Sequence, residues 1–144
     1  MTRLEGERVV DAPPDRVYAT LLDPATIAGA VPVLVSHSAV DDSHWEAQVK
    51  APLPFAPSVT VRFEIVERRR PEHAAIRSDG AGARVVSSFD LEPDGAGTRI
   101  RWRADIELGG ILAVFGGPGF EPLARRAAER VLDCVAAAAT AREA

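Results

Sequence analysis

The positions of the chain-breaking residues constrain the fold of this chain more than any other feature. A short strand-like run, Leu4–Val10, meets the breaker Ala12-Pro13-Pro14, and an amphipathic helical pattern follows over Arg16–Leu22. Proline suits the first turn of such a helix, because its missing N–H would be unpaired there anyway. Asp23-Pro24 ends this helix and a second short helix starts at the same proline. The chain therefore begins with one strand and two short helices.

The middle of the chain, from about Val33 to Leu108, has the pattern of successive strands. Strict alternation of apolar and polar residues indicates a strand with one buried and one wet face. It is cleanest at the end, where Ile100, Trp102 and Ile106 alternate with arginine and acidic residues. The expected strands are Val33–Val40, His44–Lys50, Val59–Ile65, Ala74–Ser78, Val85–Glu92 and Arg99–Leu108.

A long helical pattern over Phe120–Ala141 follows the strands. Its apolar stripe is expected to comprise Leu123, Ala127, Val131, Cys134, Val135 and Ala138. We therefore predict an α+β fold in one domain, residues 1–144, in which a curved antiparallel sheet of about seven strands wraps around a long C-terminal helix. The first strand can close against the last in such a sheet. Three arginines of the last strand would then pair with acids on both neighbours, the residues being Arg99, Arg101, Arg103, Glu5, Glu7, Asp90 and Glu92.

Composition excludes several classes of protein. The net charge of −4 argues against a nucleic-acid partner. The single cysteine, Cys134, excludes an internal disulfide and a cysteine-cluster metal site. No run approaches the roughly 18 apolar residues that span a membrane, and the first residues lack a signal-peptide pattern, so a cytoplasmic protein is expected. The His, Asp and Glu residues are not spaced as the ligands of a metal site would be, so no metal is expected. No cofactor is expected either. The oligomeric state is left open.

Small residues at inward-facing strand positions favour a cavity between sheet and helix, because they fill less volume than a dry core would use. The residues expected to line it or bind a ligand are Arg8, Phe63, Ile76, Ser87, Phe89, Trp102, Phe120, Leu123 and Ala127. Two segments are candidate gates. The glycines Gly116, Gly117 and Gly119 would let the start of the long helix move. Phe55 lies at the tip of a proline-rich loop that either folds back as a lid or contacts a partner.

Two polar residues have alternative interpretations. Arg8 has the alternation phase of the inner face, and a buried arginine must be paired, either with a ligand carboxylate or with an internal acid. The alternative is that it turns outward or extends to the rim of the cavity. His37 lies on an expected strand and is a weak candidate for a catalytic base, because the sequence supplies no orienting carboxylate.

The layout resembles the START-related superfamily, which includes polyketide cyclases and lipid-binding proteins, and within it the G-subunit family of carbon monoxide dehydrogenase. The resembling residues are Leu4-Glu5-Gly6-Glu7, Ala12-Pro13, Val17, Leu22-Asp23-Pro24, Pro32, Pro71, Gly80, Gly97-Thr98 and Leu108-Gly109-Gly110. The chain departs from that family at Pro32-Val33-Leu34 and over Pro52–Pro57, and it ends at Ala144 without the extension of longer members. Peripheral membrane contact is therefore not favoured.

The resemblance implies a helix-grip fold that binds a small lipophilic molecule. It also implies a role as accessory to a molybdenum hydroxylase of the carbon monoxide dehydrogenase type, in maturation, recruitment or quinone handling, with that redox enzyme as partner. A non-enzymatic binding protein is the leading hypothesis. One alternative is an enzyme of the cyclase or hydratase kind, in which His37 or Ser87 would move protons. The other is an assembly factor that binds protein and no small ligand.

Overall fold

A computed structural model describes residues 2–29, 34–49, 59–80, 82–109 and 120–141. Within these ranges, seven strands form one antiparallel sheet in the order β1-β7-β6-β5-β4-β3-β2. The strands are β1 (Thr2–Val10), β2 (Leu34–Ala39), β3 (His44–Val49), β4 (Val59–Arg69), β5 (His73–Gly80), β6 (Ala83–Asp94) and β7 (Gly97–Leu108). The helices are α1 (Pro14–Leu21), α2 (Pro24–Gly29) and α4 (Phe120–Ala141).

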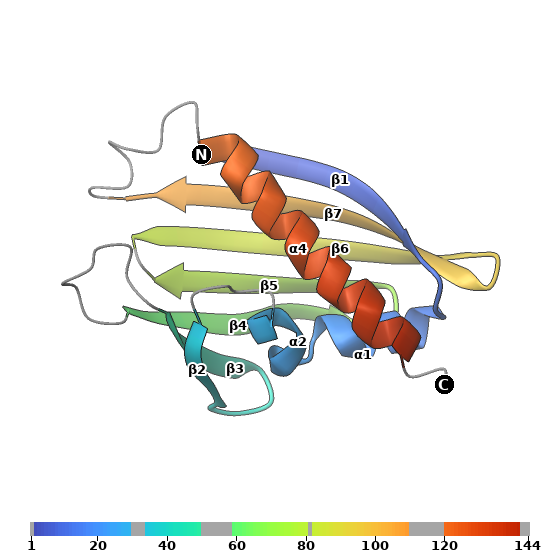
Figure 1. The fold of residues 1–144 in the computed structure, drawn as a ribbon, viewed down its shortest axis with the longest axis horizontal. Helices are drawn as coiled ribbons and strands as arrows, with labels where there is room; N and C mark the ends of the chain where they lie inside the picture. Colours follow the sequence, from blue (N-terminus) through green and yellow to red (C-terminus); the bar gives the residue numbers. More distant parts are fainter. Residues whose placement is uncertain (1, 30–33, 50–58, 81, 110–119, 142–144) are drawn as a thin grey trace.

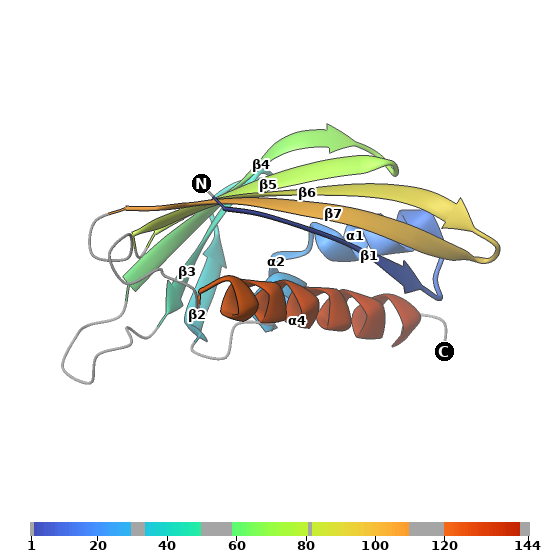
Figure 2. The ribbon, with the colours of Figure 1, turned by 90° about the horizontal axis from the view of Figure 1, so that it is seen from above.

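These helices lie on the concave face of the sheet. Helix α4 crosses that face diagonally, and the sheet arches over it, as the two views show (Figure 1, Figure 2). This arrangement confirms the predicted α+β fold with two short helices after the first strand.

The first strand pairs with the last, as expected for a curved sheet with this charge pattern. Glu5 lies opposite Arg103 and Glu7 opposite Arg101 across the β1–β7 ladder. Arg101 Nε lies 3.1 Å from Glu7, and its Nη2 lies 3.2 Å from Glu92 on β6. These exposed pairs contribute only about 0.2–1 kcal/mol each, but they favour one register over its neighbours.

The short helices begin where local chemistry starts them. Pro14 is the first residue of α1, where the absence of an N–H costs nothing. Asp23, predicted as a helix stop, also caps α2, because its Oδ1 accepts a hydrogen bond from the Ala25 N–H at 3.0 Å. One aspartate therefore separates the two helices and starts the second.

A bulge helps curve the sheet. The β4–β5 register shifts between Ile65 and Glu67, which leaves Val66 as the extra residue, with 40% of its surface exposed. Bulges bend a strand and increase its twist. The sheet can then wrap around α4 instead of lying flat on it.

The dry core lies at one end of the sheet, under α1 and the C-terminal half of α4. Its largest fully buried side chains include Val10, Val17, Leu21, Ile100 and Val135, each at most 1% exposed. The buried Thr98 hydroxyl donates a hydrogen bond to the Ala12 carbonyl oxygen at 2.7 Å, which anchors the end of β1.

Candidate functional site

The concave face of the sheet is the candidate site, because it gathers most of the sheet's apolar side chains opposite α4. The ladders place Trp102 beside Phe89 and Ala104 beside Ser87 on β6. They place Ile76 beside Ser87 and Phe63 beside Ser78 on β5. Five residues expected to line a cavity therefore share one face, namely Phe63, Ile76, Ser87, Phe89 and Trp102.

On β4, β5 and β6 the inward-facing side chains become more exposed away from the dry end, whereas on β1 and β7 Leu4 (1%) and Ile106 (5%) stay buried there. Ile100 is 0% exposed, whereas Ile76 is 6% and Phe89 and Trp102 are 7% exposed. Farther along, the inward-facing side chains are only half-buried, and they include Val61, Phe63, Ile65, Ser78, Val85 and Ser87. The apolar wall is therefore buried at the end under α1 and accessible at the other end on β4, β5 and β6.

A small pocket lies where the sheet meets α4. Its volume is about 60 Å³. The lining residues are Ser87, Phe89, Trp102, Arg103 and Ala104 from the sheet, and Ala128, Val131 and Leu132 from α4. A pocket for a drug-sized ligand has about 300–1,000 Å³. The pocket is therefore apolar and in the expected place, but it must widen to admit more than a few atoms.

The inward face of α4 differs from the predicted stripe. Ala127 is exposed, so its assignment to the cavity wall was wrong. The helix instead presents Ala124, Ala128, Val131, Leu132, Val135, Ala136 and Ala139 to the core. Alanines on several faces of α4 leave its rotation poorly specified by hydrophobic pattern alone. Phe120 and Leu123 belong to α4, but their side chains lie outside the described set.

Arg8 faces the helix, and its partner is an internal acid. Its Nη1 lies 2.6 Å from Asp133 Oδ1 on α4, and the two side chains are 35% and 65% exposed. This pair answers the question that the sequence left open between an internal acid and a ligand carboxylate. Arg8 lies at the rim, and its charge is matched within the protein. Such a partly exposed pair contributes about 0–1 kcal/mol.

Trp102 is held between a glycine and an arginine, a contact that sequence reasoning missed. A Cβ on Gly6 would lie 2.6 Å from the indole Cζ2 of Trp102, so only glycine leaves room for the ring. On the helix side, Arg125 lies 5.9 Å from the ring centroid and donates a hydrogen bond to the Glu5 carbonyl oxygen at 3.1 Å. A glycine inside a strand pattern is the signal that could have indicated this close approach.

A second aromatic contact was also missed. Trp45 on β3 stacks on Phe63 with 3.8 Å between ring centroids and 2° between planes. Trp45 is buried, whereas Phe63 is half-buried at the accessible part of the face. In the sequence, Trp45 and Ala47 alternate with the polar Glu46, which indicates that Trp45 lies on the inner face. The position of Trp45 was therefore predictable from the sequence.

His37 is exposed on the edge strand β2, with its ring edge-on to Trp45 at 6.5 Å between centroids. No carboxylate among the described residues lies within hydrogen-bond distance of its ring. The β2–β3 ladder places His37 opposite the buried Ala47, on the inner face of the sheet, although its side chain is exposed. A general base needs an orienting partner, so a role of His37 as a base gains no support from the described contacts. The candidate gates Phe55, Gly116, Gly117 and Gly119 lie outside the described residues.

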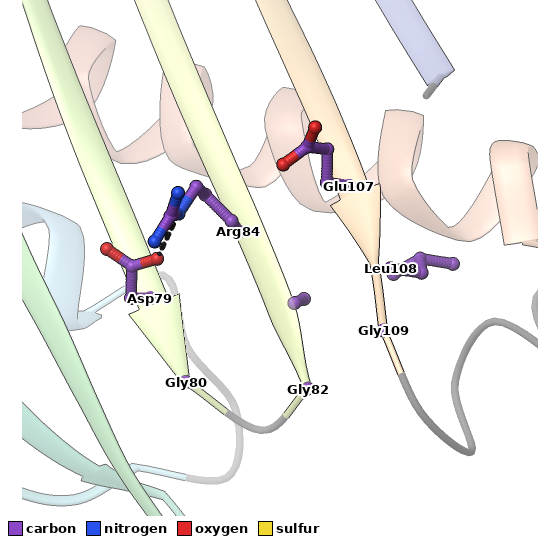
Figure 3. A pocket seen from close by; sticks show the side chains of 8 residues that line it. Asp79, Gly80, Gly82, Arg84, Glu107, Leu108 and Gly109 are labelled. Carbon is purple, nitrogen blue, oxygen red and sulfur yellow. Dashed lines mark hydrogen bonds and ion pairs between the residues drawn. The ribbon is translucent and has the colours of Figure 1, made fainter.

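Larger hollows exist on the outside of the sheet, but their chemistry is polar. One has a volume of about 520 Å³ and lies at the ends of β5, β6 and β7 (Figure 3). There Arg84 Nε lies 2.6 Å from Asp79 Oδ1, and Glu107 comes from the neighbouring strand. Paired charges around an open hollow do not suit a lipophilic molecule.

His73 joins three strands on the convex face. Its Nδ1 and Nε2 each lie 2.7 Å from a carboxylate oxygen, of Asp90 on β6 and of Glu67 on β4. Only the doubly protonated ring donates to both. The Glu67 hydrogen bond, together with Asp90, raises the pKa of His73 above its usual value of 6.5.

The raised pKa of His73 predicts a pH dependence of stability. The stabilisation is fully present below the unfolded-state pKa of about 6.5 and is lost as the pH rises through the higher folded-state value. The free energy of unfolding should therefore fall as the pH is raised above about 6.5. His73→Gln should reduce the slope of this profile in urea unfolding. The slope that remains comes from His44, because its hydrogen bond to Asp41 also raises its pKa. An unaltered profile in His73→Gln would contradict the assignment.

The described part of the chain contains neither a cluster of metal ligands nor a membrane-spanning helix. There, no three His, Cys, Asp or Glu side chains come close enough together to hold a metal ion. None of the helices described there combines the length and the apolar character that a membrane crossing requires.

Comparison with known proteins agrees with this architecture. The family model described as "Polyketide cyclase / dehydrase and lipid transport" matches residues 1–143. No curated protein matches the sequence at a significant level.

Several solved structures share the fold. A conserved protein from Geobacillus kaustophilus superposes with a TM-score of 0.80 at 14% identity, over 96% of this chain and 95% of that one. A protein from Thermus thermophilus gives 0.76 at 20% identity, over 99% and 100%. A START superfamily protein from Mycobacterium smegmatis gives 0.71 at 14% identity, over 94% of each. At such identities the likeness establishes the fold alone.

Proposed function

The chain belongs to the polyketide cyclase / dehydrase and lipid transport family, and we propose that it binds a small lipophilic molecule between the concave face of the sheet and α4. The observation that carries this proposal is the apolar pocket between Trp102 and Phe89 on the sheet and Val131 and Leu132 on the helix. Its wall continues into side chains that are only half-buried, such as Phe63. Covering such surface with a ligand is worth about 25 cal/mol per Å².

Binding requires the pocket to widen, and this can happen if part of α4 moves away from the sheet. Its C-terminal half is anchored by Val135 and Ala139, which are each 0% exposed. In the half toward its N-terminus, Ala124 and Ala128 are only half-buried. Displacing that half exposes little buried surface, so it costs less than displacing the C-terminal half.

The finer predictions rest on resemblance. An accessory role beside a molybdenum hydroxylase, quinone as the ligand and a redox-enzyme partner stay predictions, and neither the family match nor the fold neighbours test them. Catalysis of the cyclase kind would need a base in the pocket. Ser87 lines it, but His37 is exposed on β2 and has no described carboxylate partner. Binding without catalysis is therefore the function that this geometry supports best.

Native mass spectrometry of freshly purified protein, with organic extraction of any bound molecule, tests the proposal. A stoichiometric lipophilic ligand, released on extraction, is the expected result. A clean apo mass that quinones and fatty alcohols do not change, with no shift in the unfolding temperature, would reject it. Tight co-purification of an empty protein with a large partner would favour the assembly-factor alternative.

A further inference from the structure

The inner face of the three central strands offers a ligand hydroxyl groups and no charge. Along β5, β6 and β7 the inner-facing positions carry no charged side chain, and three of them carry a hydroxyl. Thr98 is 0% exposed, and its hydroxyl already donates to the Ala12 carbonyl oxygen. Ser87 and Ser78 are half-buried, and neither hydroxyl has a hydrogen-bond partner among the described residues. These two hydroxyls are therefore available to a ligand.

Ser87 lies in the pocket between the sheet and α4. Its neighbours across the ladders are Ile76 and Ala104, and among the described residues it is the one inner-face polar side chain in the pocket lining. Arg103 also borders the pocket, but strand alternation directs its side chain to the convex face, where its Nε lies 3.8 Å from Asp105 Oδ2. The polar contact that the pocket offers is therefore a neutral hydroxyl.

Ser78 continues this polar contact toward the accessible part of the face. It lies opposite Val85, two residues before Ser87 on β6, so the two serines are diagonal neighbours. Such positions on neighbouring strands lie about 7–8 Å apart. On its other side Ser78 lies opposite the half-buried Phe63, whose ring stacks on Trp45. The two hydroxyls therefore lie between the pocket and an accessible aromatic side chain.

The cations near the pocket are already matched. Arg8 pairs with Asp133, and Arg125 lies over Trp102 and donates to the Glu5 carbonyl oxygen. An anionic headgroup would have to displace one of these contacts, because burying it among apolar side chains without a cation is costly. A neutral oxygen needs only a serine hydroxyl, which can both donate and accept a hydrogen bond.

We infer that the ligand is a neutral lipophilic molecule whose carbonyl or hydroxyl oxygen hydrogen-bonds to Ser87 or Ser78, while its apolar part fills the pocket beside Trp102. This inference rests on the proposed function, narrows its ligand class and orients the ligand. It makes the two serines residues that determine specificity, separate from the apolar wall that supplies most of the affinity. It also excludes a carboxylate as the group that anchors the ligand.

Three probes of similar shape test the inference at pH 7.5, namely 2-acetylnaphthalene, 2-ethylnaphthalene and 2-naphthoate. Dissociation constants are measured for the native protein and for the double variant Ser87→Ala/Ser78→Ala. The native protein should bind the acetyl compound more tightly than the other two. A neutral hydrogen bond is worth about 0.5–1.5 kcal/mol, so the double variant should bind the acetyl compound about 2- to 13-fold more weakly. Its affinity for the ethyl compound should be unchanged, which shows that the pocket is intact.

Ser88→Ala is the matched control. Ser88 follows Ser87 on β6, lies opposite Arg103 and borders a polar hollow on the convex face, so this variant should keep the preference for the acetyl compound. If the native protein binds the acetyl and ethyl compounds equally, or if the double variant keeps the preference, the role of the two serines is overturned while lipophilic binding stands. Binding of 2-naphthoate at least as tight as that of the acetyl compound would overturn the neutral-ligand inference. Failure of all three probes to bind would overturn this inference and the proposed function together.

Discussion

Replacing Ala128 by leucine should weaken binding of lipophilic probes about 5- to 140-fold, because forcing extra methylenes into a filled space costs about 1–3 kcal/mol, and about 1.4 kcal/mol is a factor of ten in Kd. Ala128 lines the pocket between the sheet and α4. A leucine there points its added carbons at the volume that a ligand must occupy. Fluorescence titration with 1-anilinonaphthalene-8-sulfonate, followed by displacement with 2-acetylnaphthalene, measures the change.

The neighbouring residue supplies the control. Ala127 is exposed on the same helix, so Ala127→Leu makes the same change of side chain and of helix propensity without entering the pocket. Probe binding should be unchanged in Ala127→Leu. If both variants bind like the native protein, the ligand site is not between α4 and the sheet.

Replacing Gly6 by alanine should destabilise the protein by about 1–3 kcal/mol, the usual cost of overpacking a core. The new Cβ would lie 2.6 Å from the Trp102 indole. The ring cannot retreat freely toward α4, because Arg125 lies on that side at 5.9 Å from its centroid. Trp102 must therefore shift along the sheet, into the pocket that it borders. Urea unfolding and probe titration should report lower stability and weaker binding together.

Two further variants separate this clash from a general effect of alanine in a strand. Gly109→Ala should be nearly neutral, since a Cβ there would be 3.8 Å from the nearest atom, the Gly82 carbonyl oxygen. The cost of Gly6→Ala should largely disappear when Trp102 is leucine, because contacting residues show non-additive effects. An undiminished cost in the Trp102→Leu background would show that the glycine is needed for another reason.

Much of the fold was predictable, because its signals are local. Alternation along β7 and the breaks at Pro14 and Asp23-Pro24 are properties of short windows of sequence. The layout of the curved sheet allowed β1 to close against β7, and the opposite charges on β1, β6 and β7 fitted that closure. The β1–β7 ladder and the Arg101 ion pairs confirm it.

The candidate site was predictable only in part. The shared face of Phe63, Phe89 and Trp102 followed from alternation alone. The rotation of α4 did not, because alanines on several of its faces bury similar apolar area in neighbouring rotations, which explains the error at Ala127. The role of His37 depended on which strand lies at the edge of the sheet, and no local pattern records that.

The amino-acid sequence by itself determined the order of the strands and helices along the chain, the inner and outer faces of the strands, and membership of the polyketide cyclase / dehydrase and lipid transport family. The tertiary structure decided which groups meet across elements. It paired Arg8 with Asp133, set Trp102 against Gly6, and left the Ser87 hydroxyl in the pocket without a described partner. The physical reason is that periodicity is encoded in neighbouring residues, whereas each of these meetings depends on register, sheet curvature and helix rotation, which only the packing of the whole chain determines.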